Sequence, residues 1–531
     1  MSLVMPEVWL VLGMCAVILV PFINRRSDTW PMLTAVAALV LALIAAVSVI
    51  KEPGGGVFSG MLAVDPFSQF FKVLLLLFTL FIVVQWTIIS RQRTHVYDVP
   101  DFLCLLLGAT FGMALMASAN NLLMIFIATE TASLPSFALA GFRKRHRVGS
   151  ESSLKYVVFG AASSAIMLYG MSLIYGAAGT LDLAGVAGSA AGGVSPLMAA
   201  GLVAMFAGIA FKLSAVPLHF WCPDVFQGAP IEITTFLSVA SKGAAVILLV
   251  RILHAFGAQP GEPFVGLAVG VAVLGGITAT WGNLLAYHQN NIKRLLAYSS
   301  IAHAGYMIMA ASMMCLVRTN SPPAFGETVA GAILFYLLIY LFMNLGAFTV
   351  AAVLSRAPSG PAREDVRDYT GLINRSPLLA VLMGVFLLSL FGMPGLGGFM
   401  AKVYLMTAMA KVGGAAGLAL IVVLLINTLI SLYYYMRPIY YMVLVPDTED
   451  RPRAMPHTLG VAVLVVCGAA VLWAGILPGS ARDIAGTFSG IATAPAIRTQ
   501  QVGPTELAVA EPANEPDETI GPDGGDSITS H

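Results

Sequence analysis

The sequence predicts an all-α polytopic membrane protein with about fourteen transmembrane helices. Of its 531 residues, 58% are hydrophobic and only 10% are charged, whereas soluble domains carry about 25% charged residues. The apolar residues gather in runs of about 20, the length that a helix needs to cross a bilayer. Basic residues gather in alternate connections between these runs. The net charge of +1 gives no indication of nucleic-acid binding.

Fourteen apolar runs form the predicted spans. Their approximate ranges are 4–23, 31–50, 66–90, 101–118, 121–142, 153–177, 197–220, 231–253, 264–287, 294–317, 328–354, 376–410, 414–443 and 457–477. The seventh run contains Pro217, and the twelfth, which is longer than one span needs, contains Pro394 in F-G-M-P-G-L-G-G-F. Because proline lacks the N–H that a helix interior requires, we expect both helices to be broken at these prolines.

The basic residues predict the orientation of the chain. They cluster in the connections after spans 1, 3, 5, 9, 11 and 13: Arg25, Arg26, Arg91, Arg93, Arg143, Lys144, Arg145, Arg147, Lys293, Arg294, Arg356, Arg363, Arg367, Arg451 and Arg453. Cytoplasmic loops carry the excess of Lys and Arg, so we expect the odd-numbered connections in the cytoplasm. Both termini are then predicted on the outer side of a bacterial-type plasma (inner) membrane.

The two predicted breaks also indicate an internal repeat. Five spans separate them, and each has a lysine nearby, Lys212 and Lys402. Paired broken helices in corresponding positions are the sequence pattern typical of inverted repeats. We therefore expect helices 1–3 in residues 1–100, a first five-helix repeat (helices 4–8) in 101–254 and a second, inverted repeat (helices 9–13) in 264–445. Helix 14 follows in 456–478. Residues 479–531 are expected to be a disordered acidic tail, because 499–531 contain no Lys or Arg and many Pro and Gly.

Five ionisable residues within apolar runs are the candidate proton-transfer residues: Glu130, Lys212, Lys242, His303 and Lys402. Each lies in a different predicted helix. An ionisable group inside a membrane is costly and usually functional, although each could instead be part of a structural ion pair or a satisfied core group. His219, His254, His288 and Lys72 lie nearer to span ends, where an interfacial position is the better interpretation.

A carboxylate and a lysine on different helices can control the movement of a proton. At about 4 Å and an effective dielectric of about 20 such a pair attracts by about 4 kcal/mol, and doubling the distance halves that energy. We therefore expect Glu130 and Lys212 to act as a control pair. Lys242, His303 and Lys402 would continue the path sideways, if the five side chains are neighbours in space.

The sequence offers no pattern for a bound cofactor or metal. Its five cysteines are scattered in or beside apolar runs, without C-x-x-C or Cys/His spacing, so iron–sulfur, haem and zinc sites are not predicted. No G-x-G-x-x-G follows a predicted strand.

Three segments resemble one protein family. They are F-K-L-S-A-V-P-L-H-F-W-C-P-D-V-F-Q-G-A-P followed by T-F-L-S-V-A-S-K, then G-N-L-L-A-Y-H-Q-N-N-I-K-R-L-L-A-Y-S-S-I-A-H-A-G-Y, and G-M-P-G-L-G-G-F-M-A-K. These segments are similar to the antiporter-like membrane subunits of respiratory complex I, the proton-translocating NADH:quinone oxidoreductase. The P-D-V-F-Q-G-A-P motif is most similar to subunit N. Two further features favour subunit N. Lys402 stands where the sister subunit M has a glutamate, and no apolar segment after Leu477 could form the lateral helix of the largest sister subunit.

The resemblance implies fourteen helices, two inverted repeats, a proton channel and relay roles for the five residues. It implies no cofactor on this chain, with NADH, FMN, iron–sulfur clusters and quinone in partner subunits. The expected partners are other membrane subunits, the lateral helix of the largest antiporter-like sister subunit, and lipids. Two alternatives remain open at this point: a subunit of a multi-subunit sodium/proton antiporter, and a structural scaffold subunit with inert charges.

Overall fold

Helices make up nearly all of the structure. The computed structural model of the chain describes residues 2–23, 29–50, 54–89, 98–143, 147–259, 263–316, 324–355, 364–412, 414–447 and 457–491. Within these ranges twelve helices are long and apolar enough to cross a membrane. The all-α membrane fold is therefore confirmed, while the count of fourteen and the inverted repeat stay predictions.

The first part of the chain forms a helical layer and one small hairpin. A short turn η1 (Ser2–Val4) leads into α1 (Met5–Ile23) and α2 (Thr29–Val49), and strands β1 (Gly55–Val57) and β2 (Leu62–Val64) precede α3 (Pro66–Ile89). The strands pair antiparallel, with Gly56 opposite Ala63. This hairpin is an element that the all-α prediction missed.

The predicted first repeat contains the first broken helix. Its elements are α4 (Val99–Ser118), α5 (Leu122–Ala140), α6 (Arg147–Ala178), α7 (Leu183–Ser189), α8 (Pro196–Leu213), α9 (Trp221–Gly228), α10 (Ile231–Phe236), the π-helical turn η4 (Leu237–Ser241) and α11 (Lys242–Gly257). The Ser195 side chain caps α8, which begins with Pro196 and ends at Ser214 in the left-handed conformation. Pro217 lies in the non-helical connection between α8 and α9. Residues 231–257 form one span that includes the π-helical turn, and its residues 231–253 are all buried.

The predicted second repeat contains a similar interruption. Its elements are α12 (Val265–Ala286), α13 (Ile292–Leu316), α14 (Ala324–Leu354), the 3₁₀ turn η5 (Val366–Tyr369), α15 (Leu372–Arg375), α16 (Pro377–Phe391), α17 (Gly397–Val412) and α18 (Gly414–Val443). Gly392 and Gly395 have φ of +93° and +90°, a region that glycine adopts without steric cost. Pro394 stands between them, so the break lies between α16 and α17.

The end of the chain differs from the prediction. After α19 (Thr458–Ile476), Pro478 opens a further helix, α20 (Pro478–Thr487), and proline is favoured at the first position of a helix. Ala481 and Ala485 are fully buried, and α20 lies against α14. The disordered tail was therefore predicted to begin too early. Residues 492–531 lie outside the described residues.

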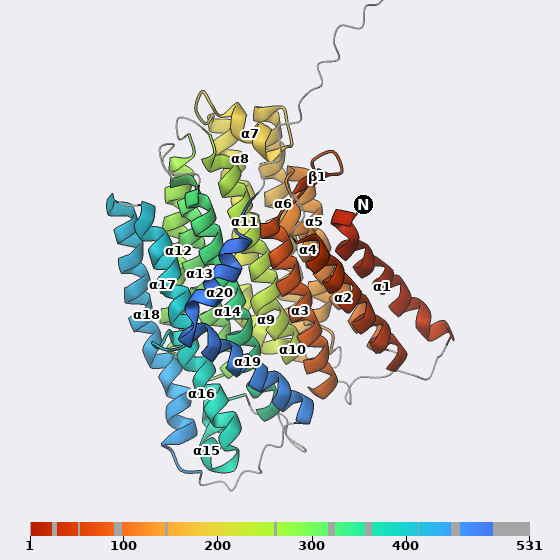
Figure 1. Cartoon of the computed structure of the whole chain (residues 1–531), viewed down its shortest axis with the longest axis vertical. Helices are drawn as coiled ribbons and strands as arrows, with labels where there is room; N and C mark the ends of the chain where they lie inside the picture. The colour runs from red at the N-terminus through yellow and green to blue at the C-terminus, as the bar shows by residue number, and fades with distance from the viewer. Residues whose placement is uncertain are drawn as a thin grey trace, which may run out of the picture. The chain divides into compact units, whose positions relative to one another are not determined.

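The bundle is organised around two helices of the second half. Figure 1 shows α13 and α14 in the middle, with α1 and α2 on one side and α18 on the other. Most of the basic loop residues that predict the orientation lie outside the described residues: Arg25, Arg26, Arg91, Arg93, Lys144, Arg145, Arg356, Arg363, Arg451 and Arg453. The predicted orientation therefore stays a prediction.

Candidate functional site

Glu130 and Lys212 lie on neighbouring elements of the first half. Glu130 is a half-buried residue of α5, and its Oε1 accepts a hydrogen bond of 2.5 Å from the Ser164 hydroxyl of α6. Lys212 is the last charged residue of α8, and only 6% of its surface is exposed. Its ammonium group donates to the Ser133 hydroxyl on α5. Ser133 follows Glu130 by three residues, so the two side chains share one face of α5.

The direct Glu130–Lys212 ion pair that the sequence suggested is not formed. Within the described ranges, the Lys212 ammonium makes no contact of 4.0 Å or less with a carboxylate, and its polar partner is Ser133. Its other neighbours are the rings of Phe137 and Phe211, 5.5 and 5.7 Å from Nζ to the centroids. Ser133, one turn further along α5 than Glu130, is the residue that the Lys212 ammonium group contacts.

Lys242 begins α11 immediately after the π-helical turn. It is 1% exposed, and its ammonium group donates to the Ser300 hydroxyl of α13. Cys222 Sγ of α9 lies 3.5 Å from the same nitrogen, and the Phe226 ring lies 5.3 Å away. Single π-helical turns inside helices are frequent at functional sites. Here the turn directly precedes the buried lysine.

His303 lies on α13, about one turn after Ser300. Its Nδ1 is 2.5 Å from the Tyr336 hydroxyl of α14, and its Nε2 is 3.2 Å from the Tyr435 hydroxyl of α18. The Tyr435 hydroxyl is also hydrogen-bonded to Ser299. Both ring nitrogens therefore have partners that can either donate or accept a proton.

Lys402 lies at the second break. It belongs to α17, and its ammonium group donates at 2.6 Å to the carbonyl of Phe391, the last residue of α16. That carbonyl is available because the helix ends there, and the final carbonyls of a helix have no partner within it. The ammonium group also lies 5.3 Å above the Tyr306 ring of α13.

Helix α13 contains one of the five candidate residues and contacts two others. On α13, Ser300, His303 and Tyr306 follow one another at three-residue spacing. Ser300 contacts Lys242, the Tyr306 ring contacts Lys402, and His303 is itself one of the five candidates. At 1.5 Å per residue these three positions cover about 9 Å of the helix. The spacing of S-S-I-A-H-A-G-Y contained this signal, but the sequence analysis singled out His303 alone.

Aromatic side chains pack around the segment between Lys212 and Cys222. Trp221 Nε1 donates to the Phe211 carbonyl at 3.1 Å, and the Tyr156 ring stacks on Trp221 with centroids 4.3 Å apart. The Phe211 ring is also a neighbour of the Lys212 ammonium group, and Cys222, which follows Trp221 in the sequence, contacts Lys242. The five residues thus form two groups, Glu130 with Lys212 and Lys242 with His303 and Lys402.

The half-helix after the first break is held by charges. Asp224 Oδ2 of α9 is 2.9 Å from Lys155 Nζ of α6, and its Oδ1 is 2.7 Å from Arg294 Nη1 of α13. Partial burial raises the pKa of the Asp224 carboxyl, but the bonds from Lys155 and Arg294 outweigh it, so the pKa lies below its usual value. Asp224, prominent in the sequence, thus joins α9 to both halves of the chain.

Two buried ion pairs lie outside the predicted set. Lys72 of α3 is 2.6 Å from Glu7 of α1 and only 1% exposed, so it is buried in the bundle, while the interfacial position expected for it stays a prediction. Arg251 of α11 is 2.9 Å from Asp65. A buried charge is costly unless it is paired, and these two pairs join α1 to α3 and α11 to the residue that precedes α3. Among the described residues no cluster of three His, Cys, Asp or Glu side chains could hold a metal ion.

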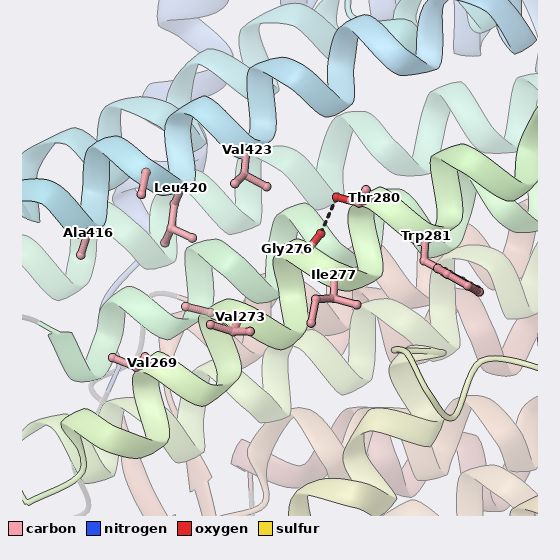
Figure 2. A pocket seen from close by; sticks show the side chains of 11 residues that line it. Val269, Val273, Gly276, Ile277, Thr280, Trp281, Ala416, Leu420 and Val423 are labelled. Atoms are coloured by element: carbon pink, nitrogen blue, oxygen red, sulfur yellow. Dashed lines mark hydrogen bonds between the residues drawn. The ribbon is translucent and has the colours of Figure 1, made fainter.

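One apolar hollow on α12 lies apart from these residues. A cavity of about 580 Å³ lies between α12 and α18, and Val273, Ile277, Trp281 and Leu420 are among the residues that line it (Figure 2). None of the five candidate residues lines it. Thr280, at its wall, donates to the Gly276 carbonyl at 2.9 Å.

The chain matches known proteins over most of its length. The family described as NADH:quinone oxidoreductase/Mrp antiporter, TM, matches residues 119–431. NADH-quinone oxidoreductase subunit N of Anaeromyxobacter sp. (strain Fw109-5) is 40% identical over 495 residues, covering 87% of this chain and 91% of the relative. NAD(P)H-quinone oxidoreductase subunit 2 of Picosynechococcus sp. (strain ATCC 27264 / PCC 7002 / PR-6) is 36% identical over 526 residues, covering 97% and 94%.

Solved structures have the same fold. A chain of respiratory complex I from Thermus thermophilus with bound aureothin matches with a TM-score of 0.74 and 32% identity, over 90% of this chain and 99% of that one. A chain of the Mrp complex from Dietzia sp. DQ12-45-1b matches with a TM-score of 0.73 at 20% identity, over 92% and 97%, which is a likeness of fold alone. The resemblance found in the three motifs is confirmed. This protein belongs to the NADH:quinone oxidoreductase/Mrp antiporter family of transmembrane proteins.

Proposed function

We propose that this chain is a proton-translocating membrane subunit of an NADH:quinone oxidoreductase. The observation that carries the proposal is the buried group of ionisable side chains around α13. His303 belongs to a row of polar side chains on this helix, and Lys242 and Lys402 contact the same row. Full burial of two lysines and a histidine is costly in a membrane, and none of the three is ion-paired with a carboxylate within the described ranges. A purely structural role would not require three such groups along one helix.

The five residues take different roles in this proposal. Lys212 holds a proton at Nζ against the Ser133 hydroxyl, and Glu130 controls its charge from the same face of α5. Lys242, His303 and Lys402 pass protons, or the electrostatic influence of a proton, along α13. The break at Pro394 leaves the Phe391 carbonyl free to accept from Lys402, and broken helices of this kind line other ion paths through membranes.

The rest of the assembly would supply the redox chemistry. We infer that NADH, FMN, iron–sulfur clusters and quinone are bound by partner subunits. Neighbouring membrane subunits, the lateral helix of the largest antiporter-like sister subunit and lipids would contact this chain. The chain would lie in a bacterial-type plasma membrane, with both termini on the outer side.

The second candidate is a subunit of a multi-subunit sodium/proton antiporter, which the shared fold with the Mrp complex favours. Mass spectrometry of the complex purified through an affinity tag on this chain separates the two. We expect flavin-containing and iron–sulfur subunits to co-purify, together with other membrane subunits. A complex that contains only membrane subunits and exchanges sodium for protons would overturn the proposal.

A further inference from the structure

A buried hydrogen-bond network joins α12 and α18 beside Lys402. Asn283 of α12 is its centre: the side-chain NH₂ group donates to the Tyr306 hydroxyl and to Asn427 Oδ1, both at 3.0 Å. Its Oδ1 accepts at 2.9 Å from the Tyr434 hydroxyl of α18. Asn283 and Asn427 are 0% and 1% exposed. The centre of the network thus lies inside the bundle.

The far end of the network reaches the surface cavity between the same two helices. The Asn427 NH₂ group donates to Thr280 Oγ1 and to the Val423 carbonyl, both at 2.9 Å. Thr280 and Val423 line that cavity (Figure 2). The NH₂ group and the side-chain oxygen of Asn283 and of Asn427 therefore each have at least one hydrogen-bond partner. Fully satisfied buried networks fix the orientation of their members.

The near end of the network determines where the Tyr306 ring lies. The ring carries the Lys402 ammonium 5.3 Å above its centre, and a cation is attracted to a ring face in this arrangement. The Tyr306 hydroxyl, at the opposite end of the ring from the backbone, is held by Asn283. The other titratable groups facing this region are His303 on α13, Tyr336 and Tyr340 on α14, and Tyr434 and Tyr435 on α18.

We propose that Asn283 is a positioning residue for Lys402. By holding the Tyr306 hydroxyl, it keeps the ring face under the ammonium group, and through Asn427 it makes this arrangement depend on the contact between α12 and α18. The inference rests on the proposed relay role of Lys402. It extends that role to three residues of the network that do not contact the lysine: Asn283, Asn427 and Tyr434.

The test uses variants in the complete, purified complex, reconstituted in vesicles. Asn283→Leu removes the amide, and Tyr306→Phe keeps the ring but removes the hydroxyl that Asn283 holds. Thr407→Val is the matched control, because Thr407 is an exposed residue of α17 whose hydroxyl donates to the Val403 carbonyl of the same helix and takes no part in the network. We expect the first two variants to pump protons several-fold more slowly and with an altered pH profile, and the control to keep the parent profile. Damage to folding would lower pumping by the same factor at every pH.

The outcomes separate this inference from the proposed function. If Lys402→Met pumps like the parent, the relay role itself fails. If Lys402→Met does not pump, while Asn283→Leu and Tyr306→Phe give the parent pH profile after scaling, only the positioning role is overturned. Should Asn283→Leu fail to assemble on a native gel, Tyr306→Phe decides the question alone, since it removes one hydroxyl and leaves the packing in place.

Discussion

Replacing Lys212 with Met is expected to leave the complex assembled and to reduce proton pumping to background. Met has a similar length and fills most of the same volume, and removing a buried charge does not destabilise a protein interior when no oppositely charged partner is left in contact. The variant loses the proton carried by Nζ and the hydrogen bond to Ser133. A positioned proton donor contributes on the order of 100-fold or more to the rate of a proton transfer.

The measurement for Lys212→Met is quinone reductase activity together with proton uptake in vesicles. Lys411→Met is the matched control, because Lys411 is an exposed lysine in the last turn of α17. The control should pump like the parent. Parent-like pumping by an assembled Lys212→Met variant would show that this lysine is inert, and would favour the scaffold interpretation for the first half of the chain.

Replacing Gly305 with Val is expected to abolish assembly or to lower the thermal stability of the complex strongly. A Cβ at this position would lie 2.5 Å from the backbone nitrogen of Ala279 and 2.7 Å from the carbonyl oxygen of Gly275. Both are backbone atoms of α12, so α12 and α13 would have to move apart. Overpacking costs about 1–3 kcal/mol and sometimes more, and small residues are what allow membrane helices to approach closely.

The position of Gly305 gives this variant a second effect. It lies between His303 and Tyr306, so any complex that does assemble should also pump poorly. Gly270→Val is the control on α12, because nothing lies within 4 Å of a Cβ there. The measurement is a native gel followed by thermal unfolding. Normal stability and pumping of Gly305→Val would mean that the α12–α13 contact is looser than the structure has it.

The sequence predicted the membrane fold and the chemical character of the site. Apolar runs of about 20 residues are set by the thickness of a bilayer, so span positions follow from composition. The burial of Lys212, Lys242, His303 and Lys402 follows from the same rule, because an ionisable group in the middle of a span has no solvent to reach.

The partners of these residues could not be predicted from the sequence. Tyr336 and Tyr435 contact His303 across 33 and 132 positions of the chain, and no local pattern encodes such contacts. The contact between Lys212 and Ser133 spans 79 positions of the chain and likewise has no local signal. Local turn chemistry was the missed signal elsewhere, as in the S-G sequence at Ser59–Gly60 between the two short strands.

The central claim is that buried side chains along α13 gain and lose protons, and Lys242→Arg tests it most directly. Arginine keeps the positive charge and can still donate to Ser300, but its guanidinium does not release a proton in proteins. A structural cation would tolerate this change, whereas a proton-exchanging one would not. The measurement is proton uptake by vesicles containing the purified complex during quinone reduction. We predict an assembled complex without proton uptake, and uptake at the parent rate would contradict the account.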